Sequence, residues 1–549
     1  MHTAGRTLVS LLELNGIDRV FCMPGESYLE LLDALADSSI DTVTARHEGS
    51  AGFMALADGR LAGRPGVFTV SRGPGATNAS IALHSAQQDG LPLILIIGQV
   101  PRNQLNRGSF QEIDYQQMFG GIAKWVAEVT DPERLPEVIT RAITVAMQPT
   151  PGPVVISIPE DLLEIPMEPP RNLVPAFTHT TYAPDQNKIT RILELLDRAE
   201  RPLIIAGGEF STDEDRQLLQ RFAERHHVPV AVGFRRHGVF PNQHPLSAGD
   251  LGIGTTPEQL SQFEEADFIM ALGTRLNDWT TLGYRFPSSP WPTQPFVHAC
   301  ADAGTIGKNI QPTIGMASYG PGVVRALLDV GAEGTAPSPG RRAWVEKLAG
   351  YAAARQVWKP QRFDDGVAFG NVLAALAGTL PETTSMVPDA GISAALVYRY
   401  FPFGGPRRLY STISGVMGYG VPGAIAIAMR EPHRTVVCLV GDGSFMMTGT
   451  EIAIAVERKL PVRIIVSNNR SLGTIRMHQE QQYPGRSHAT DLPGPNFVQF
   501  AQAFGCQAFS IAKDEDILPA IEAAMKVDGP ALIEVNASLA SITQRAAGS

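Results

Sequence analysis

The sequence predicts an α/β protein of three domains, each a parallel sheet flanked by helices. With 549 residues the chain is too long for a single hydrophobic core. Short apolar runs that end at glycine recur along it, and their lack of polar alternation is typical of strands buried on both faces. Two proline-rich passages, 166–184 and 331–340, show neither a helical nor a strand period and are expected to be linkers. They leave domains at 1–165, 186–330 and 345–549.

The composition excludes several classes of protein. Hydrophobic residues make up 44% and charged residues 18% of the chain, as in ordinary soluble globular proteins. The net charge of −10, without a cluster of Lys and Arg, argues against nucleic acid as a partner. No apolar run has membrane length and the segment 535–549 is small and polar, so no membrane partner is expected. The scattered cysteines lack metal spacing and are expected to be buried thiols in a cytoplasmic protein; they are Cys22, Cys300, Cys438 and Cys506.

The first domain opens with an amphipathic helix that leads into a strand, and not with a signal peptide. A strand at 67–70, a Gly-Pro-Gly turn at 73–75, a helix at 78–87 and a strand at 93–97 are expected to follow. The same order of strand, glycine turn, helix, Leu-Pro and strand recurs from residue 436. The first and third domains are therefore expected to share one α/β plan.

Glu48 is the candidate acid of the first domain. It follows a strand-like run at 41–45 and precedes small residues that suit a closely packed helix. Burial of a carboxylate at such a junction favours its protonated form, a condition for proton exchange near neutrality. A surface or helix-capping role is the alternative, and it is the more common one for a glutamate taken alone.

In the middle domain, the apolar strands within 202–208 and 267–273 end at glycine. Gly207 and Gly208 fit a cradle for a nucleotide phosphate and, equally, a tight turn between strand and helix.

The third domain carries the strongest motif. A strand at 436–440 ends at Gly441-Asp442-Gly443, and a helix at 450–458 precedes a strand at 462–466 and Asn468-Asn469. Because parallel strands end at the same edge of a sheet, Asp442 and Asn469 are expected to meet there. Carboxylate and amide oxygens suit Mg²⁺ that also binds a diphosphate, whose charge a helix N-terminus favours. A strand–turn–helix without a ligand is the alternative.

Gly-Asp-Gly, 24 further residues and Asn-Asn resemble the diphosphate motif of thiamin diphosphate (ThDP) enzymes. More stretches are similar to the large subunit of acetolactate synthase, and the likeness runs through nearly all of the chain: Pro24-Gly25, His47-Glu48-Gly49, residues 73–78, residues 98–101 and Phe110-Gln111-Glu112. The resemblance implies a ThDP-binding fold with a pyrimidine domain, a central Rossmann-like domain and a diphosphate domain.

The resemblance also implies roles for single residues. Glu48 would contact the aminopyrimidine and relay a proton, and Met417 would be the apolar wedge beneath the cofactor. Asp442, Asn469 and the backbone carbonyl of Ser471 would bind Mg²⁺. The implied cofactor-binding residues are Gly25, Pro74, Asn78, Gly415, Met417, Gly441, Asp442, Gly443, Ser444, Asn469, Ser471, Leu472, Gly473 and Thr474.

The implied activity is that of a ThDP- and Mg²⁺-dependent decarboxylase and carboligase, which forms an enamine from a 2-oxo acid and adds it to a carbonyl acceptor. Simple decarboxylation, as in benzoylformate decarboxylase, and cleavage of a 2-hydroxyacyl compound remain open. A non-catalytic binding protein is disfavoured because Glu48 and the metal ligands are kept. Family members place the glutamate of one subunit against the diphosphate domain of another, which implies a homodimer at least and commonly a homotetramer.

The chain departs from acetolactate synthases around the substrate. Glu26 replaces a glycine and is expected to pair with Arg72; Gln111 and Glu26 are the further candidates for acid–base or acceptor-positioning roles. His478 aligns with the tryptophan that selects the acceptor in the synthases. The tentative substrate residues are Arg72, Phe110, Ile475 and His478.

FAD is possible but doubtful. An arginine that contacts FAD in the synthases aligns with Trp279, and an aspartate near the adenosine aligns with Cys300.

Overall fold

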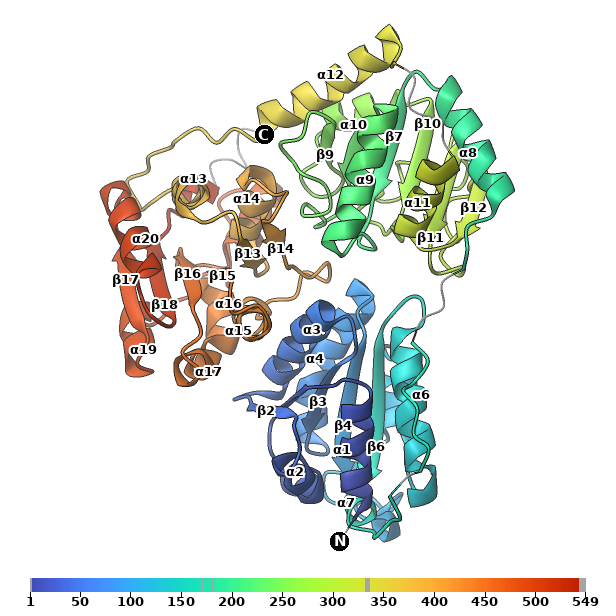
Figure 1. Cartoon of the computed structure of the whole chain (residues 1–549). Helices are drawn as coiled ribbons and strands as arrows, with labels where there is room; N and C mark the ends of the chain where they lie inside the picture. Colours follow the sequence, from blue (N-terminus) through green and yellow to red (C-terminus); the bar gives the residue numbers. More distant parts are fainter. Residues whose placement is uncertain (1, 170, 179–181, 331–335, 543–549) are drawn as a thin grey trace.

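A computed structural model describes residues 2–169, 171–178, 182–330 and 336–542. These residues form three domains, each built on a six-stranded parallel sheet with helices on both faces (Figure 1). The predicted fold class is confirmed. No helix among the described residues has both the length and the apolar character needed to cross a bilayer.

The first sheet has the strand order β2-β1-β3-β4-β6-β5. Its strands are β1 (Arg19–Cys22), β2 (Asp41–Thr44), β3 (Gly66–Val70), β4 (Leu93–Gln99), β5 (Trp125–Glu128) and β6 (Pro153–Pro159). Its helices are α1 (Ala4–Leu14), α2 (Leu29–Ala36), α3 (Glu48–Ala62), α4 (Pro74–Asp89), α5 (Tyr115–Phe119), α6 (Leu135–Met147) and α7 (Glu160–Leu163), with 3-10 turns η1 (Glu26–Tyr28), η2 (Arg102–Gln104) and η3 (Pro132–Arg134).

The central sheet has a different order, β12-β11-β10-β7-β8-β9. Its strands are β7 (Pro202–Ala206), β8 (Val230–Val232), β9 (Ser247–Asp250), β10 (Phe268–Leu272), β11 (Phe296–Cys300) and β12 (Ile314–Ala317). Its helices are α8 (Gln186–Arg198), α9 (Asp213–His226), α10 (Pro257–Glu264), α11 (Gly320–Val330) and α12 (Pro339–Arg355).

Helix α12 lies on the central domain (Figure 1). Ser338 caps its first turn by accepting from the Arg341 backbone N–H, and the Trp344 indole donates to the Pro202 carbonyl oxygen at 2.8 Å. The helix therefore begins inside the passage expected to be a linker, of which residues 331–335 lie outside the described residues. We propose that the boundary to the third domain follows Arg355, later than the expected residue 345.

The third sheet repeats the strand order of the first, as β14-β13-β15-β16-β18-β17. Its strands are β13 (Thr384–Pro388), β14 (Arg408–Leu409), β15 (Thr435–Gly441), β16 (Val462–Asn468), β17 (Gln507–Ile511) and β18 (Ala531–Asn536). Its helices are α13 (Phe369–Thr379), α14 (Ile392–Tyr400), α15 (Gly420–Arg430), α16 (Asp442–Thr448), α17 (Ile452–Glu457), α18 (Gly473–Gln482), α19 (Phe497–Ala503) and α20 (Ile517–Met525), with 3-10 turns η4 (Gly449–Glu451) and η5 (Asp514–Asp516).

Two sequence expectations for this sheet need comment. The shared plan of the first and third domains is present in the matching strand orders. The helix expected at 450–458 is present as α17, Ile452–Glu457, but a separate helix that was not expected, α16, precedes it and starts at Asp442 directly after β15. A carboxylate in the first turn complements the positive end of the helix dipole, which favours a helix start at this point.

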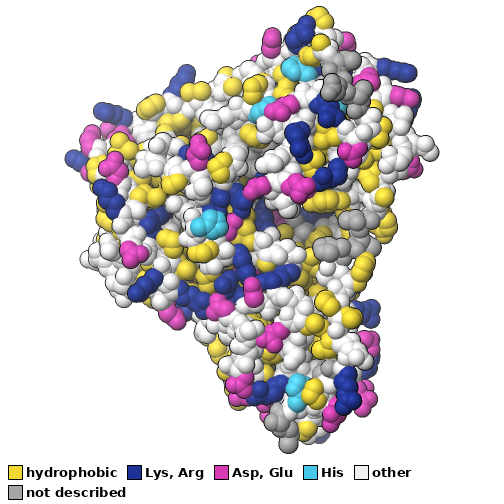
Figure 2. Space-filling model, viewed as in Figure 1, with side chains coloured by type: hydrophobic (Ala, Val, Ile, Leu, Met, Phe, Trp, Pro, Cys, Tyr) yellow, Lys and Arg dark blue, Asp and Glu magenta, His cyan; other side chains and the backbone are white. Residues whose placement is uncertain are grey.

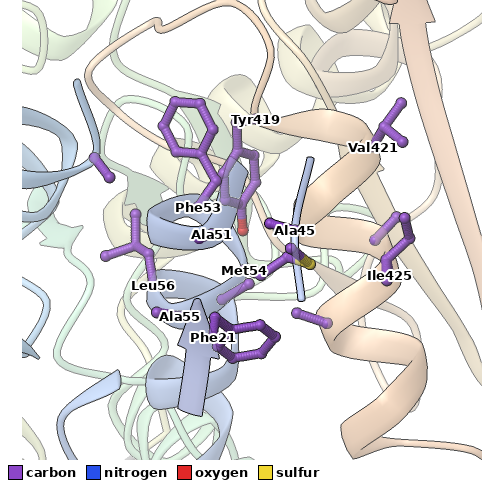
Figure 3. Packing of buried hydrophobic residues seen from close by; sticks show 14 of the residues in the cluster. Phe21, Ala45, Ala51, Phe53, Met54, Ala55, Leu56, Tyr419, Val421 and Ile425 are labelled. Atoms are coloured by element: carbon purple, nitrogen blue, oxygen red, sulfur yellow. The ribbon is translucent and has the colours of Figure 1, made fainter. Parts of the chain in front are cut away.

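Helices α3 and α15 pack side by side and join the first domain to the third (Figure 3). Phe53 of α3 meets Tyr419, the residue before α15, edge to face with 6.0 Å between ring centroids. Ala51 and Ala55 on α3 are fully buried, and their small side chains allow the close approach of α15. The buried apolar cluster at this seam is continuous across the two domains.

Ion pairs border the same seam. Arg430, the last residue of α15, donates to both carboxylate oxygens of Asp18 at 2.8 Å and to Asp58 at 2.6 and 3.0 Å. Arg458 donates to both oxygens of Asp41 at 2.8 Å. These contacts fix the orientation of the two domains in addition to the apolar packing. All four cysteines are buried, free thiols, as expected.

Candidate active site

Glu48 is the first residue of α3 and faces the Gly-Pro-Gly turn. The His47 imidazole caps the helix by accepting from the Gly49 backbone N–H at 3.0 Å. The Asn78 side-chain amide donates to Glu48 Oε2 at 2.9 Å, and a Cβ at Gly75 would stand 3.3 Å from Glu48 Oε1. The carboxylate is partly exposed, and not enclosed as the sequence suggested.

A hollow of about 400 Å³ lies beside this turn; its lining residues are Gly73, Pro74, Thr77, Asn78, Gln111, Glu112 and Ile113. Gly73 has φ +50°, and a Cβ there would stand 2.6 Å from the Gln111 carbonyl oxygen, so only glycine fits. Gln111 itself has φ +63°. The structure thus brings Gln111, Pro74 and Asn78 together with Glu48, whereas the Phe110 side chain is 75% exposed. We call this group the pyrimidine half-site.

Asp442 and Asn469 come to one edge of the third sheet, as predicted. Strands β15 and β16 are neighbours, with Gly441 opposite Ser467, so the residues that follow each strand lie close together. Asp442 is 4% exposed, and its Oδ1 accepts from the Gly443 backbone N–H at 2.9 Å. Its Oδ2 is buried and has no hydrogen-bond partner among the described residues. Burial raises the pKa of Asp442, and nearby backbone N–H groups of residues 443, 470 and 471 oppose that shift.

The oxygens around Asp442 fit Mg²⁺. Asn469 Oδ1 accepts from the Ser471 backbone N–H at 3.0 Å, and the Ser471 carbonyl accepts from Gly473 at 2.7 Å. Each of these oxygens keeps a second lone pair, and Asp442 Oδ2 lacks a donor. No cluster of three or more His, Cys, Asp and Glu side chains suited to a metal occurs in the described parts of the chain. A metal site here would consist of one carboxylate and neutral oxygens, a ligand set suited to an ion that also binds phosphates.

The loop before α15 carries Gly415 and Met417 to the same place. Gly415 has φ +68° and is exposed. A Cβ built on Gly443 would stand 3.6 Å from Met417 Cε and 3.1 Å from Leu472 Cδ2, so these two apolar side chains flank the Gly441–Gly443 backbone. Helix α18 begins at Gly473, one residue after Leu472, and directs its first backbone N–H groups towards this edge. We call this group the diphosphate half-site.

Asp389, which follows β13, holds that loop and was not singled out from the sequence. It is 2% exposed and accepts from the backbone N–H groups of Gly418 at 3.1 Å and Gly420 at 2.6 Å. The Thr448 hydroxyl donates to the Gly418 carbonyl at 2.9 Å and so ties the loop to α16. An acidic residue directly after a buried strand was the only sequence signal for this role.

Within one chain, the third domain contacts the Glu48 junction at a residue outside the diphosphate half-site. The strand–helix junction that carries Glu48 rests on Glu451, which is fully buried and accepts from the Arg46 backbone N–H at 3.1 Å. Glu451 follows the C-terminal end of α16, whereas Asp442 begins that helix. In the described parts of the chain no hydrogen bond or ion pair joins Glu48 to Asp442 or Asn469.

The expected pairing of Glu26 with Arg72 is wrong. Arg72 Nη1 pairs with Glu160 Oε2 at 2.9 Å, because Glu160 follows β6 directly and so reaches the same end of the sheet as Arg72, which follows β3. Glu26 is exposed in η1. Gly25, just before it, approaches Ser71 so closely that a Cβ would stand 2.6 Å from Ser71 Cβ.

The remaining substrate candidates lie on α18, beside the diphosphate half-site. His478 and Ile475 are exposed, and neighbouring Arg476 pairs with Asp491 at 2.6 Å. This segment is a helix, and both side chains are open to solvent.

The central domain does not offer a phosphate cradle at Gly207 and Gly208. A Cβ at Gly207 would collide with the Gly273 carbonyl, and one at Gly208 would stand 2.8 Å from Arg236 Nε, so the tight-turn alternative holds. The Glu209 carboxylate accepts from the backbone N–H groups of Ala301 at 2.8 Å and Gly320 at 2.7 Å. Desolvation raises the pKa of Glu209 to about 7. These two donors are therefore occupied and not free for a phosphate.

Comparison with known proteins agrees with this geometry. Residues 2–118, 189–327 and 389–535 match the N-terminal TPP binding domain, the central domain and the C-terminal TPP binding domain of the thiamine pyrophosphate enzymes. The chain is 32% identical to the acetolactate synthase isozyme 1 large subunit of Escherichia coli, over 97% of this chain and 93% of that protein.

Two other relatives show the breadth of the group. The acetolactate synthase large subunit of Corynebacterium glutamicum is 30% identical over 97% of this chain and 86% of its own length. The putative thiamine pyrophosphate-containing protein YdaP of Bacillus subtilis is also 30% identical, over 97% of this chain and 91% of its own length. The chain therefore belongs to the thiamine pyrophosphate enzymes, as a relative of the acetolactate synthase large subunits.

Proposed function

We propose that the protein is a ThDP- and Mg²⁺-dependent enzyme that removes CO₂ from a 2-oxo acid and joins the remainder to a second carbonyl compound. The observation that carries this proposal is the pair of half-sites, one centred on Glu48 and one on the unpartnered Asp442 Oδ2. ThDP, when bound, supplies the nucleophilic carbon and the electron sink that loss of CO₂ requires. All other tasks fall to the protein.

At the diphosphate half-site, Asp442, Asn469 and the Ser471 carbonyl hold Mg²⁺. The backbone N–H of Thr474 in the first turn of α18 would donate to a phosphate oxygen, and Gly473 beside it would allow a close approach. Gly441, Gly443 and Ser444 provide a backbone surface with little steric bulk. Leu472 and Met417 would present apolar surface to the cofactor rings, and the Gly415 carbonyl would accept from the amino group of the pyrimidine.

At the pyrimidine half-site, Glu48 exchanges a proton with the ring nitrogen that it faces. Asn78 orients this carboxylate through its 2.9 Å hydrogen bond. Gln111 borders the hollow in which the acceptor binds, while Gly25 and Pro74 shape its walls. The exposed Glu26 and Phe110 remain candidates for substrate contact, as do Ile475 and His478 on α18. Arg72, paired with Glu160, is withdrawn as a partner for Glu26.

We also propose a homodimer as the minimum active unit, assembled further into a homotetramer. Support comes from the contacts of the Glu48 junction, which in one chain are with Glu451 and not with Asp442; a second copy would bring its own Glu48 to this diphosphate half-site. Exposed apolar side chains near both half-sites provide contact surface for that copy: Phe110, Met446, Met447, Ile475 and Tyr483. The buried thiols support a cytoplasmic location. FAD stays an open question, although Glu209 occupies two backbone donors of the central domain.

Product analysis tests the proposal. Purified protein with ThDP and Mg²⁺ is incubated with a panel of 2-oxo acids, alone and with an aldehyde, and CO₂ and carbon products are measured. We expect ThDP-dependent CO₂ release and a new carbon–carbon bond. Release of a free aldehyde as the only product would leave decarboxylation alone, and no CO₂ from any 2-oxo acid would refute the proposal. The absorption spectrum of the purified protein decides whether flavin is bound.

A further inference from the structure

Arg235 reaches from the central domain to the diphosphate half-site. It follows β8 in the left-handed region, with φ +56°, which is uncommon for any residue other than glycine. Its Nη1 donates to the Thr412 carbonyl of the third domain at 2.7 Å. The guanidinium also lies 5.1 Å from the ring centroid of Phe234 and 5.5 Å from that of Tyr398. Two aromatic rings and one carbonyl thus fix this side chain across the domain boundary.

The free edge of the guanidinium borders the Gly415 loop. Arg235 Nη2 stands 3.8 Å from the position of a Cβ at Gly415, and no other heavy atom lies within 4 Å of that position apart from the residue's own neighbours. Gly415 is exposed, and Met417 follows two residues later. Arg235 is therefore at the rim of the space that the cofactor rings and substrate share in the proposed function.

The charge of Arg235 has no carboxylate partner in the described parts of the chain. Its Nε is buried and has no acceptor. The next residue, Arg236, shows the contrast, because it faces Asp89 at 3.6 Å, and Asp89 in turn accepts from the Ile413 backbone N–H. Figure 2 shows Lys and Arg side chains gathered where the three domains meet, although the protein carries a net charge of −10. A fixed guanidinium with unpaired donors is suited to a carboxylate ligand.

We propose that Arg235 binds the carboxylate of a 2-oxo acid acceptor and so makes such acids preferred over aldehydes. The inference rests on the proposed function. The donor carboxylate is a poor ligand for Arg235, because pairing it would stabilise the ground state from which CO₂ must leave. The acceptor carboxylate persists into the product.

The reaction that this site serves is balanced. Two 2-oxo acids and one proton give CO₂ and one 2-hydroxy-3-oxo acid. The donor's bond to its carboxylate breaks, its electron pair forms the bond to the acceptor's carbonyl carbon, and the carbonyl oxygen takes the proton. Arg235 forms no covalent bond. It binds the acceptor's carboxylate, whose charge is the same in substrate and product.

The test compares Arg235→Met, Arg235→Lys and the surface control Arg325→Met, whose side chain is 53% exposed on α11. Pyruvate serves as donor, with equal concentrations of pyruvate and benzaldehyde competing as acceptors. For Arg235→Met we expect kcat/KM for the acid acceptor to fall on the order of 10–100-fold, the usual range for a hydrogen bond to a charged group. The kcat/KM for ligation to benzaldehyde should change less than threefold, and total CO₂ release should fall in step with the acid ligation that it accompanies. Arg235→Lys should be intermediate, and Arg325→Met should match wild type.

A binding measurement separates this inference from the proposed function. Oxamate, an unreactive analogue of pyruvate, is titrated into the holoenzyme; we expect Arg235→Met to weaken its binding by the same factor and to leave ThDP affinity unchanged. If wild type releases no CO₂ from any 2-oxo acid, the proposed function fails, and oxamate still decides whether Arg235 binds a carboxylate. Any of three results would overturn the inference. They are an equal loss of both ligations together with weaker ThDP binding, an unchanged ratio of the two ligation products, and an undiminished affinity for oxamate.

Discussion

Replacing Asp442 with asparagine should remove the metal dependence of cofactor binding and leave the fold intact. The change keeps the size of the side chain and an oxygen that can accept from Gly443, but it removes the negative charge. Because Asp442 Oδ2 has no hydrogen-bond partner among the described residues, its charge takes part in no ion pair with them. We therefore expect the free energy of unfolding without ligands to change by no more than about 1 kcal/mol.

With ligands the effect should be large. At a ligand concentration 100 times its Kd, binding to the folded state alone stabilises a protein by about 2.7 kcal/mol. Loss of the only carboxylate at the metal site should weaken binding by at least the roughly 100-fold seen for outer-shell changes. The same ligand concentration then equals the Kd of the variant, and the stabilisation by the ligand falls to about 0.4 kcal/mol.

Titration calorimetry at saturating Mg²⁺ measures the affinity for ThDP. Denaturation with and without both ligands measures how much they stabilise the fold. Asp491→Asn is the matched control, because Asp491 lies in the adjacent loop and its side chain is 87% exposed. A variant at Asp442 that keeps Mg²⁺-dependent ThDP affinity within threefold of wild type would refute the metal assignment.

The same residue predicts a pH effect with a definite sign. The pKa of Asp442 is raised on folding, so the folded metal-free protein holds its proton more tightly than the unfolded chain. Asp442 therefore makes the metal-free protein lose stability as pH rises from about 3.9, the ordinary value for aspartate, through the raised value. Mg²⁺ should reverse this dependence, because the ion requires the charged form. Asp442→Asn should abolish both trends in denaturation curves recorded across that window.

Three further changes test other parts of the molecule. Glu48→Gln should retain ThDP and lose turnover by about 10²–10⁴, and near-normal activity would remove Glu48 from the mechanism. Arg430→Met leaves the buried Asp58 with fewer partners and should lower the free energy of unfolding by about 2–4 kcal/mol in urea titrations. The hydrogen bond from Arg430 is also the main cause that holds the pKa of Asp18 below its ordinary range. A lowered carboxyl pKa stabilises the folded protein near neutrality, and this stabilisation is lost as pH falls below about 4. The variant should therefore lose less stability than wild type on acidification. Asp389→Asn should reduce kcat while circular dichroism stays unchanged, and retained kcat would show that the loop it holds is positioned by other contacts.

The sequence predicted what depends on local pattern. Apolar runs located the strands, and the rule that parallel strands end at one edge placed Asp442 beside Asn469. The motif could be recognised from the 24 residues between Gly-Asp-Gly and Asn-Asn without knowing what structure those residues form. The start of α16 was missed because glycine and serine in its first turn have low helix propensity. Tertiary packing overrides that preference here, since Phe445 is fully buried in the seam core.

Side-chain partners distant in sequence could not be predicted in the same way. Arg72 and Glu160 are 88 residues apart, and their meeting follows from the order β3-β4-β6, which no local pattern gives. The nearer Glu26 was the natural guess, yet η1 leaves it exposed. Arg235 is a similar case, because its role depends on the third domain presenting Thr412 and Gly415 to the end of a central strand.

The seam between α3 and α15 explains why one chain is expected to be inactive alone. Its apolar contacts and the pairs of Arg430 with Asp18 and Asp58 fix the first domain on the third. In that orientation the junction before Glu48 is held by Glu451, beyond the far end of a seven-residue helix that begins at Asp442. Such a helix is about 10 Å long, and it separates Asp442 from the Glu451 contact. The same contacts that stabilise the chain thus hold the Glu48 junction against Glu451, which supports the proposal that a second copy completes the site.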